Sequence, residues 1–132
     1  LVLDGDWCEP GLLPVVIYVE QGQATHLGSF TAEARHCTNN ETGEFVDGVV
    51  VMIAANGDEL HGTYAGAFLP DLPDGTSRTT GLHHYDGGTG RFANAPGDAE
   101  EGSRFVFTSE TEGVIWGTLA GTLSYDASDR RN

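Results

Sequence analysis

The chain has 132 residues, of which 39% are apolar, so it can bury the core of one folded domain and is too apolar for a disordered segment. Its 20 acidic residues face only six arginines and no lysine, which gives a formal net charge of -14. Such a surface repels nucleic acid and anionic membranes, and no apolar run reaches the roughly 20 residues of a transmembrane helix. We therefore expect neither a nucleic-acid partner nor a membrane span.

Segments of alternating or β-branched residues, separated by turns rich in Gly, Pro, Asn and Asp, predict strands and no helices. Eight strands are predicted, at residues 15–20, 24–38, 44–55, 58–69, 76–85, 91–95, 103–110 and 114–125. An irregular lead-in at 1–13 precedes this domain (14–125), and a polar tail at 126–132 follows it. Because mostly short turns join the strands, we expect pairing in sequence order. Closure into an eight-stranded antiparallel up-and-down β-barrel then removes exposed edges.

Two turns decide how this prediction is divided into strands. The glycine-rich stretch 87–99 is predicted to be a tight corner, with Phe92 as the first large apolar residue after it. Residues 98–102 (Asp-Ala-Glu-Glu-Gly) are predicted to be an acidic turn. The glycine corner lacks the Lys-Ser/Thr pair of a phosphate-binding loop, so we interpret it as a feature of the fold.

The two cysteines, Cys8 and Cys37, are predicted to form one disulfide that pins the lead-in to the second strand. Two buried free thiols are the alternative. A bridge implies an oxidising compartment, so the predicted location is extracellular, at the cell surface or periplasmic.

The segments ATHLGSFT (24–31), ANGDELHGTY (55–64) and GGTGRF (87–92) resemble bacterial proteins of the allene oxide cyclase barrel-like family. The last segment is also similar to the Gly-Gly-Thr-Gly-Lys-Phe segment of plant dirigent proteins, which share that barrel. The resemblance implies an eight-stranded antiparallel barrel that holds an apolar substrate at its mouth. It also implies that ring closure or radical coupling is steered there without a cofactor. No catalytic residue is carried over to this chain.

Aromatic side chains are the best candidates for a binding site. On the strand at 58–69, Leu60, Tyr64 and Phe68 alternate with glycines on one face, which suits the inside of a small barrel. The predicted ligand-lining residues, with two polar tips among them, are Tyr64, Phe68, His84, Phe105, Phe107 and Tyr125. The same residues suit a packed core, and we favour a packed core with a shallow mouth.

No metal site is predicted. His83 and His84 are adjacent, so on a strand they point to opposite faces, and no other histidine spacing is typical of a metal site. The acidic turns do not match a calcium loop. No cofactor is expected.

These observations favour a small acidic secreted or cell-surface barrel that acts as a binding or assembly module rather than an enzyme. An apolar small molecule at the barrel mouth is one expected partner, and further copies of the chain in an oligomer or extracellular assembly are another. The first alternative is a cofactor-free cyclase, isomerase or stereochemical guide. The second is a structural subunit of an extracellular assembly.

Overall fold

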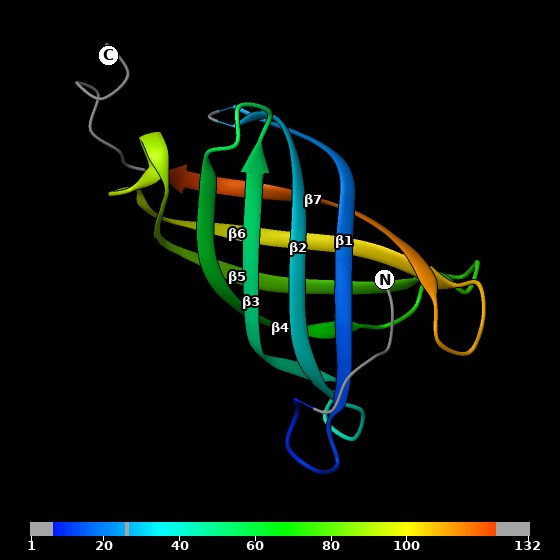
Figure 1. Ribbon diagram of the computed structural model, residues 1–132. Coiled ribbons are helices and arrows are strands. Elements are labelled where there is room, and N and C mark those ends of the chain that lie inside the picture. The colour runs from blue at the N-terminus through cyan, green and yellow to red at the C-terminus, as the bar shows by residue number, and fades with distance from the viewer. Residues whose placement is uncertain (1–6, 26, 124–132) are drawn as a thin grey trace.

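The computed structural model describes residues 7–25 and 27–123, which form one antiparallel sheet curled into a nearly closed barrel (Figure 1). Each strand pairs with the next in sequence. The strands are β1 (Leu13–Ala24), β2 (Gly28–Asn39), β3 (Glu44–Ala54), β4 (Glu59–Leu69), β5 (Ser77–Gly88), β6 (Pro96–Phe107) and β7 (Gly113–Leu123). The predicted all-β single domain with sequential antiparallel strands is confirmed. The described residues contain seven strands, however, and not eight.

The strand predicted at 91–95 is wrong, because the chain forms a short 3-10 helix, η1 (Gly90–Phe92), at this place. Gly90 has a φ of 57°, a left-handed conformation that ends the extended backbone. Phe92 then turns inward and is 0% exposed. The predicted acidic turn at 98–102 is also wrong. These residues continue β6, where Asp98 and Glu100 point outward to solvent and therefore need no loop.

β1 is longer than predicted, and it includes residues 21–23, which separate the first two predicted strands and were expected to form the turn between them. The pairing of β1 with β2 shifts register between Val19 and Gly22, so a bulge absorbs the irregularity. Gly22 lies against the ring of Phe30 on β2, where a Cβ atom would overlap that ring. A glycine that was expected to reverse the chain instead allows close contact between two strands.

One end of the barrel is tightly packed. Its core lies where β3 ends and β4 begins, and Phe92 closes it from η1. Arg91 Nη1 lies 3.0 Å from Asp58 Oδ2, which ties the glycine corner to the β3–β4 turn. The buried cluster extends from this end along the inner face to Tyr64 on β4 and to Phe45 at the start of β3. Its members are Leu27, Ala32, Phe45, Val50, Met52, Ala54, Leu60, Tyr64, Tyr85, Phe92, Ala95 and Ala99.

The predicted disulfide is confirmed: Cys8 is bonded to Cys37 on β2, with the two Cα atoms 5.8 Å apart. It joins the described part of the lead-in to the sheet. Residues 1–6, His26 and 124–132 lie outside the described part of the chain, and with them the predicted polar tail. Within the described residues, no helix has the length and apolar character needed to cross a membrane.

Candidate functional site in the barrel interior

The middle of the inner face carries polar side chains between the packed end and the opposite end of the barrel. Tyr64 on β4 lies directly across from His83 on β5, and both face inward. Next to them, Tyr85 faces Gly62, and the missing side chain at Gly62 gives the tyrosine ring its room. Period-two alternation therefore places two tyrosines and a histidine on one buried surface.

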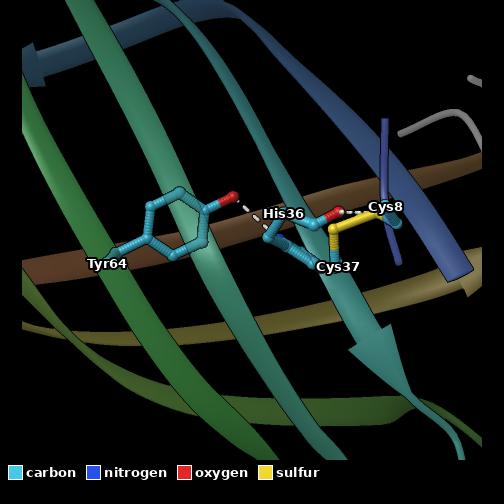
Figure 2. The surroundings of a disulfide bond; sticks show 4 residues. All are labelled: Cys8, His36, Cys37 and Tyr64. Atoms are coloured by element: carbon cyan, nitrogen blue, oxygen red, sulfur yellow. Dashed lines mark hydrogen bonds between the residues drawn. A yellow bond between two sulfur atoms is a disulfide. The ribbon is translucent and has the colours of Figure 1, made fainter. Parts of the chain in front are cut away.

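His36 on β2 extends this group across the barrel. His36 Nδ1 and the Tyr64 hydroxyl form a hydrogen bond of 2.7 Å. The Tyr64 ring stacks on His83 with centroids 5.0 Å apart, and His83 Nδ1 forms a 3.1 Å hydrogen bond with the Tyr85 hydroxyl. Figure 2 shows His36 between the disulfide and Tyr64, whose hydroxyl points at the His36 ring. Cys8 Sγ lies 3.9 Å from the His36 carbonyl oxygen, so the bridge abuts this network.

Burial keeps these groups uncharged. Loss of hydration lowers the pKa of His36 to about 4 and that of His83 to about 4. The same cause raises the pKa of Tyr85 to about 12. For Tyr64, burial and then the nearby Glu101 carboxylate raise the pKa above its usual range. At neutral pH the interior therefore holds neutral imidazoles and protonated phenols.

Glu101 on β6 is the acidic member of the interior. It lies directly across from Gly81 on β5 and from Leu119 on β7, so its side chain points to the inner face. Gly81 in turn faces Gly66 on β4. The Phe45 ring fills the space at Gly66, whereas a Cβ atom on Gly81 would lie 3.1 Å from Glu101 Oε2. The carboxylate therefore occupies room that Gly81 provides.

The two oxygens of Glu101 differ in their surroundings. Oε1 accepts a hydrogen bond of 3.3 Å from the Thr79 hydroxyl, which also bonds to the Ser103 hydroxyl. Oε2 is buried and has no hydrogen-bond partner among the described residues. Burial raises the pKa of Glu101, and the hydroxyls of Ser103 and Thr79 offset part of that rise. A buried carboxylate oxygen without a donor is costly, so it favours a bound donor or a proton.

Aromatic rings surround the end of the barrel opposite the packed core. Phe68 contacts Phe45 and Phe105 with ring centroids 6.1 and 5.8 Å away, and Phe107 meets Phe105 edge-on at 5.7 Å. Phe105 is buried, whereas Phe68 and Phe107 are exposed. Aromatic side chains with a few polar groups among them are the usual lining of a small-molecule site.

The structure brings four of the six predicted lining residues together on the inner face: Tyr64, Phe68, Phe105 and Phe107. His84 is not among them. Its ring lies on the outer face, where Nδ1 is 2.8 Å from Asp98 Oδ1 at an exposed pair. That pair borders a shallow open depression of about 690 Å³ over β3 to β6, which also includes Val49 and Leu82. Tyr125 lies outside the described residues.

Sequence reasoning missed His83 and Glu101 as interior residues. For Glu101 a signal was present, because counting back in twos from Phe105 gives Ser103 and then Glu101 on the same face. For His83 the alternation along the strand was misleading. It places His84 on the same face as Leu82, and an apolar residue is typical of the inner face. Leu82 is 67% exposed, so the apolar member of this strand faces solvent.

No three His, Cys, Asp or Glu side chains within residues 7–25 and 27–123 are grouped closely enough to hold a metal ion. Comparison of the chain with protein-family models, with characterised proteins and with solved structures finds no match. The site therefore has to be interpreted from its own geometry.

Proposed function

We propose that the protein is a binding module whose barrel interior takes a small, largely apolar molecule carrying one hydrogen-bond donor. The observation that carries this proposal is the Glu101 carboxylate. One of its oxygens is buried on the inner face without a hydrogen-bond partner, next to Gly81 on the neighbouring strand. A ligand O–H or N–H that reaches Oε2 would satisfy the carboxylate.

The surroundings of Glu101 narrow the class of ligand. The rim rings of Phe68 and Phe107 are exposed and offer flat apolar contact. Tyr64 and His36 are already bonded to each other, so they leave Glu101 as the acceptor that needs a donor. A planar aromatic or polyunsaturated alcohol or amine fits these requirements better than an anion, which the carboxylate would repel.

Naphthol and methoxynaphthalene make a matched pair of probes, because they have the same ring system and only naphthol has a donor. Naphthol should raise the melting temperature of the protein more than methoxynaphthalene does, since any ligand that prefers the folded state stabilises it. Replacement of the acceptor in Glu101→Met should weaken naphthol binding by about 10- to 100-fold, the usual value of a hydrogen bond to a charged group.

The control is Glu100→Met, one residue away on the outer face of the same strand. This variant removes an equal charge and should bind naphthol as the wild type does. An interior site at Glu101 would be refuted if both probes bound equally well. It would also be refuted if Glu101→Met and Glu100→Met lost the same amount of naphthol affinity.

A cofactor-free cyclase or isomerase is the second candidate function. It is favoured by a carboxyl group of raised pKa that lies near Tyr64 inside an apolar barrel, a typical setting for general acid-base chemistry. It also agrees with the resemblance of the glycine corner to allene oxide cyclase barrel-like and dirigent proteins. In this case Glu101→Gln should abolish turnover of a polyunsaturated epoxide while naphthol still binds. Turnover that persists in Glu101→Gln would exclude Glu101 as the catalytic group.

The disulfide supports a place of action outside the reducing cytosol, at the cell surface, in the periplasm or in the extracellular space. Assembly into a larger extracellular structure fits the same location. Mass spectrometry of protein purified from its native source without reductant should show the bridge intact.

A further inference from the structure

We propose that β7 is a self-association edge, on which the β7 of a second copy pairs in antiparallel orientation about a two-fold axis at Thr118. This inference does not depend on the proposed ligand. Among the described residues, β7 pairs with β6 on one side, and no strand pairs with its other side. Trp116 on the outer face is 46% exposed and Leu119 on the inner face is 40% exposed. The strand is therefore uncovered on both faces.

The two free edges of the sheet differ in how they are protected against pairing. β1 carries Pro14, which has no N–H to donate, the charged residue Glu20 and the bulge between Val19 and Gly22. β7 has no proline and no charged residue, and it keeps one continuous register with β6. Natural edge strands usually carry such protective features. Their absence from β7 alone indicates that this edge is normally covered.

The sequence of β7 indicates what covers it. With Thr118 opposite Thr118 of the second copy, Leu119 lies opposite Gly117, Ile115 opposite Gly121, and Trp116 opposite Ala120. In this register Ile115, Trp116, Leu119 and Leu123 each face a glycine or an alanine, so the two strands can interdigitate. Shifting the centre to Gly117 places Ile115 opposite Leu119 and leaves Gly117 opposite itself. Centred on Thr118, the strand is therefore complementary in size to itself.

The charges favour a second copy over an unrelated peptide. Because β7 has no charged residue, it offers no ion pair to a charged strand of another protein. Two chains of formal net charge -14 repel each other, and an uncharged strand is where such chains can approach at the lowest electrostatic cost. The partner would supply an eighth strand beside Leu119, which faces Glu101, and so extend the inner face. The interface is isologous, as a two-fold axis requires.

The test uses the symmetry of the pair. Sedimentation velocity of the full chain at increasing concentration should show a monomer of 14.0 kDa in equilibrium with a species of twice that mass. Thr118→Lys and Thr118→Glu each place like charges opposite one another at the axis. Each variant alone should raise the dimer dissociation constant by about two- to fivefold, and an equimolar mixture of the two should restore the dimer.

Matched controls are Thr63→Lys and Thr63→Glu, at an exposed threonine on the outer face of the central strand β4. They should dimerise as the wild type does, and circular dichroism should show all four variants folded. A wild type that stays monomeric, a dimer insensitive to charge at residue 118, or a mixture that fails to recover would each overturn the proposal. Covering of β7 by another part of the same chain would give the first of these results.

Discussion

Acidification should destabilise the barrel through its two buried histidines, His36 and His83. They are only 6% and 8% exposed. Burial lowers the pKa of each from 6.5 to about 4, so between these values the unfolded chain binds protons that the folded chain does not. The stability contributed by neutral imidazoles is therefore present above pH 6.5 and is lost as the pH falls towards 4.

The size of the effect follows from these values. Lowering the pH from about 7 to about 5 should reduce the free energy of unfolding by about 2 kcal/mol per histidine and by roughly 4 kcal/mol for the pair. Glu101 acts in the opposite direction, because its raised pKa favours the folded state as the pH falls. The contribution of each histidine is best isolated by comparing variants over the same pH interval.

Urea unfolding followed by circular dichroism at both pH values gives the required free energies. His36→Asn and His83→Asn should each lose about 2 kcal/mol less on acidification than the wild type does. Thr80→Asn, at an exposed site on the outer face of the same strand, should keep the wild-type loss. The reasoning is refuted if either buried-site variant responds to pH as the wild type does.

Three further predictions concern stability. The double variant Cys8→Ser/Cys37→Ser should have a free energy of unfolding lower by about 3.5 kcal/mol, because the bridge closes a loop of 29 residues. Urea unfolding without reductant measures this loss, and an unchanged unfolding midpoint would contradict it. Glu101→Met should be more stable than the wild type by about 1–3 kcal/mol at mildly alkaline pH and gain less on acidification, since it removes a buried unpaired oxygen; a loss of stability there would count against that account. Phe92→Ala should lower the free energy of unfolding by about 3–5 kcal/mol and Phe107→Ala by about 1 kcal/mol, because Phe92 is buried and Phe107 is exposed. Equal decreases in melting temperature for the two variants would argue against a barrel with one packed end and one open end.

The strands and their inner faces followed from the sequence wherever one strand carries its own alternation. On β4 the predicted inward set of Leu60, Tyr64 and Phe68 lies on the inner face. On β5 the local pattern failed, because the exposed Leu82 shares a face with His84. The side that Tyr85 takes depends on Gly62 across the sheet, and that pairing register is a long-range property.

The strand count failed for a related reason. A glycine corner followed by Phe92 is typical of the start of a strand. Burial of Phe92 in a 3-10 turn, however, depends on contacts with β4 and β5 that no local pattern contains. Glu101 was hidden in a run of acidic residues and glycine, a composition usual for turns. Only its spacing of four residues from Phe105, an even number along a strand, places it inside the barrel.

The most direct test of an interior site at Glu101 is the NMR titration of its side-chain carboxyl carbon, with and without naphthol. The account predicts that the free protein titrates at a pKa above the ordinary glutamate value, because the carboxylate is buried. Bound naphthol should lower that pKa, since a donated hydrogen bond favours the charged form. An ordinary pKa in the free protein, or a titration that naphthol leaves unchanged, would contradict it.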